Sequence, residues 1–282
     1  MNRPLLALLL GATCIALSPI FVRVSELGPS ATAFWRVALA LPLLWPLLAF
    51  EKGAAGKAQW RLLLAAGVAF AGDLAFWHWS IRATSVANST LLANLASLFV
   101  TLAAWVFLRQ RPSGAFLAGL GAALAGVAML VRTSAAFSPT ALLGDAFGVI
   151  TAMFYAGYIL AVKALRDRGA STVQVMTVTS AVSALLLLPV ALASGEALLP
   201  RSAAGWLTLA GLAWISQCAG QGLIAYALAH LPAAFSSVSL LFQPVMAALF
   251  AWVLLAEPLS PLQMAGGAVV LLGIYLARRG SA

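Results

Sequence analysis

The sequence predicts an all-helical protein that crosses a membrane many times. Hydrophobic residues make up 63% of its 282 residues, and charged residues make up only 8%. A soluble globular domain carries about 25% charged residues, so the charges here are too few to cover a water-exposed surface. The apolar stretches are about 20 residues long, which is the length that an α-helix needs to cross a bilayer. The composition therefore excludes a soluble globular protein and indicates an all-α polytopic membrane protein.

Ten apolar segments have this length, and short breaks with turn and charge signals separate them. Arg111-Pro112-Ser113-Gly114 is one such break. The first segment continues past Pro19 to Val24, which favours a retained helix over a cleaved signal peptide. The ten predicted transmembrane helices are Leu5–Val24, Ser30–Ala49, Trp60–Ile81, Val86–Phe107, Gly114–Val131, Leu143–Val162, Val173–Ala193, Ala204–Ala227, Ala233–Leu254 and Pro261–Ala277.

The basic residues of the short loops predict the orientation. If the amino terminus is cytoplasmic, eleven Lys and Arg residues fall on that side and four on the other. Loops rich in Lys and Arg stay in the cytoplasm, so we expect a multi-pass protein of the bacterial inner membrane with both termini cytoplasmic. The same bias explains the net charge of +9 without a nucleic-acid partner. The four residues outside are Arg23, Arg82, Arg132 and Arg201.

The two halves of the chain resemble each other. A shift of 147 residues (252 − 105) aligns the end of the first half with the end of the second. Each half has five helices, an odd number, so the second half enters the membrane inverted. Many secondary transporters are built from inverted repeats with the substrate site between them, near the midplane. We therefore expect two five-helix repeats, residues 1–135 and 136–282. The aligned pairs are Trp105 and Trp252, Ser113 and Ser260, Gly119 and Gly266, Gly126 and Gly273, and Arg132 and Arg279.

Local motifs resemble the EamA-type branch of the drug/metabolite transporter superfamily. Phe34-Trp35-Arg36 resembles the arginine-bearing second helix of that family, and Phe242-Gln243-Pro244-Val245 resembles part of its ninth-helix signature. The first half departs from this signature, because Ser97 stands at the position of Pro244. The resemblance covers essentially the whole chain and is greatest to the members that export aromatic amino acids. It implies efflux of a small molecule.

Polar residues inside the membrane are the candidate functional residues, because a polar group in hydrocarbon is costly unless it is paired or faces water. Arg36 and Asp73 are expected at similar depth in neighbouring helices. Three roles remain open for this pair: a structural salt bridge, coupling of transport to protons through Asp73, and binding of a substrate carboxylate by Arg36.

Five polar or aromatic residues are candidates for substrate binding. Trp77 and His78 lie near the outer end of the third helix, and Asn94 lies at the depth of Asp73. Tyr155 and Tyr158 are three residues apart, so they share a helix face and could stack on an aromatic ligand. The alternatives are an interfacial role for His78, an interhelical hydrogen bond for Asn94 and helix packing for the tyrosines.

Two prolines predict helix breaks at membrane depth. Pro19 and Pro244 each remove a backbone donor and free a carbonyl one turn earlier. Such breaks are tolerated where protein or a water-filled cavity satisfies the backbone, so Gln243, beside Pro244, is a sixth binding candidate. Gln217 and Gln221 are one turn apart on the eighth helix and share a face.

The expected function is secondary transport by alternating access. No Walker A, HExxH, GxSxG or CxxC pattern is present, so we expect no ATP hydrolysis by the chain, no enzyme chemistry, no metal and no other cofactor. The low charge favours substrates with much apolar area, such as aromatic amino acids. Export of cationic drugs or other metabolites and a membrane-embedded enzyme are the alternatives. The expected partners are the small-molecule substrate and the lipid bilayer, and small residues such as Gly126 fit a monomer or a homodimer.

Overall fold

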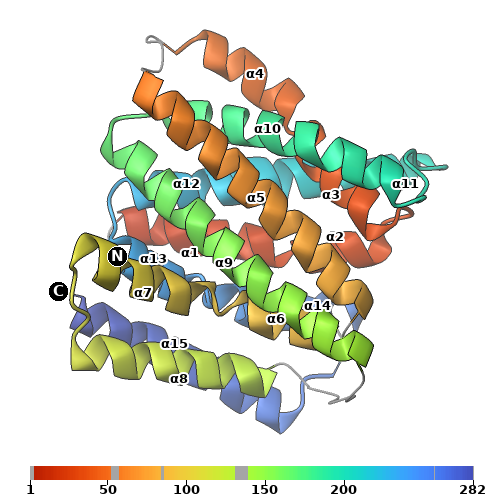
Figure 1. Ribbon diagram of the computed structural model, residues 1–282. Coiled ribbons are helices and arrows are strands. Elements are labelled where there is room, and N and C mark those ends of the chain that lie inside the picture. The colour runs from red at the N-terminus through yellow and green to blue at the C-terminus, as the bar shows by residue number, and fades with distance from the viewer. Residues whose placement is uncertain (1–2, 52–56, 84–85, 131–138, 257, 282) are drawn as a thin grey trace.

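The structure, a computed structural model, describes residues 3–51, 57–83, 86–130, 139–256 and 258–281 as a bundle of helices. Every regular element in these ranges is helical, and both ends of the chain lie on the same side of the bundle (Figure 1). The elements are α1 (Arg3–Ala16), α2 (Ser18–Val24), α3 (Pro29–Ala38), α4 (Leu41–Ala49), α5 (Lys57–Ala83), α6 (Val86–Ala93), α7 (Ala96–Leu108), α8 (Gly114–Leu130), α9 (Pro139–Asp167), α10 (Thr172–Ala193), α11 (Ala203–Gly211), the π-helix η1 (Leu212–Gln221), α12 (Gly222–Leu228), α13 (Ala233–Ser239), α14 (Phe242–Leu255) and α15 (Pro261–Gly280).

Eight helical segments of the described chain are long and apolar enough to cross a membrane, which confirms the all-helical, multi-pass class. The helix α8 is apolar but has only 17 residues. The rod formed by α11, η1 and α12 is interrupted by its π-helical middle. The number of ten spans therefore stays a prediction. The eight segments are Arg3–Val24, Pro29–Ala49, Gln59–Ser80, Ser89–Phe107, Leu142–Asp167, Thr172–Ala193, Ala233–Leu254 and Pro261–Gly280.

Pro19 and Pro244 each follow a break between two helices. The α1 helix ends at Ala16, and Pro19 is the second residue of α2. The α13 helix ends at Ser239, and Pro244 is the third residue of α14. A proline in the first turn of a helix costs little, because the backbone donor it lacks has no intrahelical acceptor there.

A third break, between α6 and α7, occurs without a proline. The side-chain amide of Asn94 donates to the Thr90 carbonyl (2.7 Å), and the Ser97 hydroxyl donates to the Asn94 carbonyl (3.0 Å). Short polar side chains that bond to nearby backbone groups offer the chain an alternative to the helical ladder. The segment Val86–Phe107, predicted as one uninterrupted helix, is therefore two helices.

The helices α8 and α15 pack against each other through glycines (Figure 1). A Cβ atom on Gly126 would lie 2.6 Å from the Val270 nitrogen and 2.7 Å from the Gly266 oxygen. Gly119 and Gly273 face each other in the same way. Small residues let transmembrane helices approach closely, so this glycine stripe holds two helices of one chain together.

We expect Gly126→Ala to lower the melting temperature of the purified protein in detergent. The added methyl meets backbone atoms of α15, and overpacking of this kind costs about 1–3 kcal/mol. Gly121→Ala on the same helix is the matched control, because nothing lies within 4 Å of its Cβ position. Alanine is the better helix former, so the control should be neutral or stabilising. Equal effects of the two changes would contradict the packing role of Gly126.

At the end of the bundle opposite the termini, two carboxylates cap helices across the two halves of the chain. The Glu26 carboxylate, between α2 and α3, accepts hydrogen bonds from the backbone amides of Arg201 (2.7 Å) and Ser202 (3.2 Å), just before α11. The Glu196 carboxylate, between α10 and α11, accepts one from the Ala31 amide (3.0 Å) in the first turn of α3. Negative charge is favourable at helix amino termini, so these reciprocal caps tie α3 to α11.

The Glu26 cap should weaken in acid. The Ser202 hydroxyl donates to Glu26 and, together with the Arg201 amide, lowers the pKa of this carboxyl. A carboxyl with a lowered folded-state pKa stabilises the fold above its unfolded value, about 4.3, and loses this contribution as the pH falls through the folded value. We therefore expect Glu26→Gln to reduce the fall in melting temperature between about pH 5 and pH 3.

Glu51→Gln, an exposed acid at the opposite end of the bundle, is the control for this comparison. Differential scanning fluorimetry at each pH measures the difference. An identical pH dependence in wild type and Glu26→Gln would exclude a stabilising role for the Glu26 cap.

Candidate functional site

A cavity of about 140 Å³ lies between the two halves of the chain. Its walls come from α1, α2, α3, α5, α6, α9, η1 and α14, and they include the breaks after α1 and α6. The charged residues of the described lining are Arg36 and Asp73. The structure thus gathers most of the residues singled out from the sequence around one space. Those residues are Pro19, Arg36, Asp73, Trp77, Asn94, Tyr155, Gln243 and Pro244.

The Arg36 side chain is almost fully buried, with 7% of its surface exposed. Its Nε donates to the Gln217 side-chain oxygen at 3.2 Å, and its Cζ lies 5.8 Å from the centre of the Phe70 ring. The Gln217 side-chain nitrogen in turn donates to the Ser180 hydroxyl at 3.3 Å. Arginine has donors and no acceptor, so the oxygen of the Gln217 amide must face Arg36. The guanidinium is therefore held at one edge, while its side chain borders the cavity.

Asp73 lies on the wall of the same cavity but forms no direct salt bridge with Arg36 within the described ranges. The structure therefore lacks the direct contact that a structural salt bridge requires. Two opposite charges that share a water-accessible space attract each other across it, yet both retain hydrogen-bonding capacity. A molecule that carries both a carboxylate and an ammonium group matches this arrangement.

Two amides add unpaired polar atoms to the cavity wall. Gln221 Oε1 and Gln243 Nε2 are buried and have no hydrogen-bond partner among the described residues, although both side chains lie beside the Tyr155 hydroxyl. A buried polar atom without a partner is costly, so such atoms are usually satisfied by ligand or water. Asn94 also lines the cavity, but its amide nitrogen is already bonded to Thr90.

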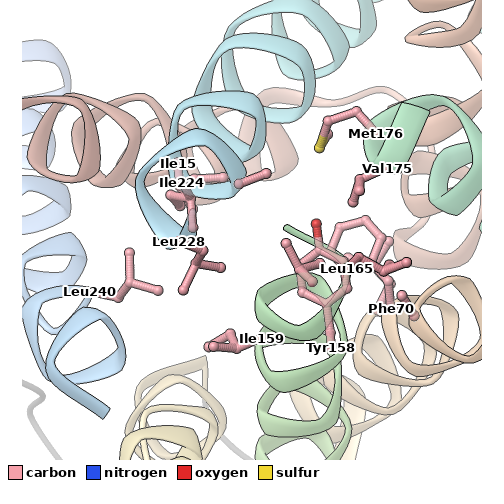
Figure 2. Close-up of a cluster of buried hydrophobic side chains, with 14 of the residues drawn as sticks. Ile15, Phe70, Tyr158, Ile159, Leu165, Val175, Met176, Ile224, Leu228 and Leu240 are labelled. Carbon is pink, nitrogen blue, oxygen red and sulfur yellow. The ribbon is translucent and has the colours of Figure 1, made fainter. Parts of the chain in front are cut away.

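Aromatic rings form the remaining part of the site. Trp77 lies on the cavity wall, and the Tyr155 ring stacks with that of Tyr158 at a centroid distance of 6.1 Å. Tyr158 is only 1% exposed and packs on Phe70 at 4.7 Å, within the buried cluster of Figure 2. Tyr158 thus supports Tyr155 from behind and does not border the cavity.

His78 also lies away from the cavity. It is 2% exposed, and its Nδ1 contacts the Leu74 carbonyl one turn earlier. Trp77 lines the cavity and His78 does not, because the residue that follows Trp77 on the helix points about 100° away from it. The sequence placed the Trp77–His78 pair near the site but could not show which of the two faces the cavity.

Apolar side chains fill the bundle on the side of the cavity nearer the chain termini. Ile15 belongs both to the cavity wall and to this cluster, which continues to Leu228 at the end of α12 and Leu240 after α13. Figure 2 shows Ile15, Ile224 and Leu228 side by side. Leu8, near the start of α1, and Leu165, near the end of α9, belong to the same cluster, so it extends from the cavity toward the end of the bundle that carries both termini.

The chain is similar over most of its length to known transporters. It is 28% identical over 271 residues to an uncharacterised transporter of Archaeoglobus fulgidus, with 91% of each chain covered. It is 26% identical to a pseudopaline exporter of Pseudomonas aeruginosa, over 98% of this chain and 95% of the exporter. It is 30% identical to a probable terminal-alkyne amino-acid exporter of Streptantibioticus cattleyicolor, over 80% of this chain and 71% of the exporter.

A solved protein structure has the same fold. It matches with a TM-score of 0.79 at 18% sequence identity and covers 98% of this chain and 96% of its own. The EamA-like transporter family matches residues 2–132 and again residues 142–279. Together with the apolar helices, this double match shows that the chain belongs to the EamA-like transporter family.

Proposed function

We propose that the protein is a secondary transporter that exports amino acids with an aromatic or other largely apolar side chain. The observation that carries this proposal is the placement of Arg36 and Asp73 on one cavity without a direct salt bridge. The carboxylate of an amino acid pairs with Arg36, its ammonium group pairs with Asp73, and each charge is then compensated. Gln221 and Gln243 supply further hydrogen bonds to the same polar end.

The side-chain preference follows from the rest of the cavity wall. Trp77 and Tyr155 offer aromatic surface, and an aromatic contact adds roughly 0.5–1.5 kcal/mol beyond the burial of area. A lysine or glutamate substrate brings a second charge, and the described lining has no further charged residue to pair with it. The similarity to a relative named for a terminal-alkyne amino acid agrees with this substrate class.

The proposed architecture is ten spans arranged as two inverted repeats, residues 1–135 and 136–282. The same family matches both halves, with starts 140 residues apart (142 − 2). Arg109 and Ala256, which are 147 residues apart, end their helices in the same left-handed conformation, with φ of 55°. Ser113 and Ser260, separated by the same interval, each accept a hydrogen bond from the first turn of the following helix. These local matches support an internal duplication.

The proposed orientation places both termini in the cytoplasm of a bacterium, with the protein in its inner membrane. The cavity then lies toward the outside, and the apolar cluster closes the cytoplasmic half. Rocking of the two halves would break this cluster and expose the site to the cytoplasm. Energy for export comes from the substrate's own concentration difference or from an ion gradient, with Asp73 as the residue able to bind a proton.

Transport in proteoliposomes tests the substrate class. We expect saturable uptake of phenylalanine or tryptophan and at least about tenfold lower uptake of lysine and glutamate, because a second charge lacks a partner.

Arg36→Gln should raise the KM for phenylalanine about 10- to 100-fold, since a hydrogen bond to a charged group contributes about 1.5–3 kcal/mol. Arg61→Gln, an exposed position on α5, is the matched control. Uptake of lysine as fast as phenylalanine would reject the proposal, and preferential uptake of cationic drugs would favour the alternative.

Cysteine labelling tests the orientation. In a variant whose two native cysteines, Cys14 and Cys218, are replaced by alanine, a cysteine at Ala197 should react with a membrane-impermeant thiol reagent in whole cells. A cysteine at Arg168 should react only after the cells are opened. Both positions are exposed and lie at opposite ends of the bundle. The reverse labelling pattern would place the termini outside.

A further inference from the structure

The Arg36 guanidinium is held by a residue that does not border the cavity. Arg36 comes from α3, its partner Gln217 from η1, and the next residue in the chain of hydrogen bonds, Ser180, from α10. Gln217 and Ser180 are both completely buried. The chain of hydrogen bonds therefore joins three helices, and both ends of the Gln217 amide are occupied.

The π-helical segment fixes the place of this amide. The Ser216 hydroxyl, directly before Gln217, donates to the Cys14 carbonyl of α1 at 3.0 Å. Cys218, directly after it, contacts the Ala40 carbonyl at 3.8 Å, between α3 and α4. Gln217 is thus clamped between two neighbours that each contact another helix. The π-helical segment runs over ten residues, and π-helical insertions within α-helices occur frequently at functional sites.

The chemistry of the contact leaves the binding face of Arg36 available. Gln217 occupies the Nε hydrogen, and the guanidinium carries four further hydrogens on its two terminal nitrogens. Two parallel N–H donors match the two oxygens of a carboxylate. Gln217 is also neutral, so it orients the guanidinium without cancelling its charge, as a glutamate at this position would do.

We infer that Gln217 is a positioning residue that fixes the Arg36 guanidinium for bidentate binding of the substrate carboxylate, and that it thereby sets the preference for substrates with a free carboxylate. This inference rests on the proposed function, in which Arg36 receives that carboxylate. Gln217 does not touch the substrate. Its removal should affect only the part of recognition that depends on the orientation of Arg36.

Binding of two ligands to the purified full-length protein tests the inference. Phenylalanine carries the carboxylate, and phenylalaninamide replaces it with a neutral group. We expect Gln217→Met to weaken phenylalanine binding about tenfold and to change phenylalaninamide binding less than about twofold, since one hydrogen bond to a charged group is lost. Gln217→Glu should weaken phenylalanine binding further, because it neutralises Arg36. Isothermal titration calorimetry measures both dissociation constants.

A double-mutant cycle separates positioning from packing. Lysine has no Nε–H donor at this place, so in an Arg36→Lys background Gln217→Met should change phenylalanine binding less than about twofold. Gln174→Met is the control for loss of a glutamine amide, because Gln174 lies in the first turn of α10 and does not line the cavity. Ser180→Ala, which frees the far end of the Gln217 amide, should weaken phenylalanine binding about threefold and covers the case in which Gln217→Met fails to fold.

The outcomes distinguish this inference from the proposed function. Equal weakening of both ligands by Gln217→Met and by Ser180→Ala would show a packing role and overturn the inference. If Arg36→Gln, which removes the positive charge, leaves the ratio of the two dissociation constants unchanged, Arg36 does not receive the carboxylate, and the proposed site fails as well. If Arg36→Gln abolishes the difference between the two ligands while the Gln217 and Ser180 variants preserve it, only the positioning role is wrong.

Discussion

A positive charge buried inside a membrane protein has to be compensated by its surroundings. Arg36 is 7% exposed, and removing a guanidinium from water costs several kcal/mol even after the protein relaxes. The Gln217 oxygen and the Phe70 ring face the group, but neither carries a negative charge. Asp73 carries one, and it stands apart from Arg36 across a cavity. This incomplete compensation is the basis for the proposal that the cavity binds a dipolar ligand.

Different physical interactions hold the two ends of the bundle together. At the end opposite the termini, the Glu26 and Glu196 caps join α3 to α11 through hydrogen bonds that water can replace. On the other side of the cavity, apolar side chains such as Leu228 and Leu240 exclude water. If these apolar side chains separated in another conformation of the protein, they would be exposed to water unless they formed new apolar contacts. Ile15 belongs to both the apolar cluster and the wall of the cavity, so the two are in direct contact.

The sequence predicts the helical, multi-pass class well because the length of an apolar run has a direct physical meaning in a bilayer. The search for polar and aromatic residues at membrane depth singled out Arg36, Asp73 and Trp77, and all three line the same cavity. The break at Asn94 was not predicted, because it arises from side-chain hydrogen bonds without a proline. Spacing along a helix could not show that Trp77 and Tyr155 line the cavity while His78 and Tyr158 do not, because tertiary packing decides which face of a helix borders a cavity. Gln217 bonds to Arg36 whereas Gln221 lines the cavity, although the two residues were expected to share a helix face. Both belong to the π-helical segment, whose turns differ from those of the α-helix assumed in that prediction.

A structure of the purified protein with bound phenylalanine tests the central claim most directly. We expect the ligand to occupy the cavity between the halves, with its carboxylate within hydrogen-bonding distance of the Arg36 terminal nitrogens and its ammonium group beside Asp73. Its ring should lie against Trp77 or Tyr155. Phenylalanine bound in this cavity in the reverse orientation, or bound outside it, would contradict the account.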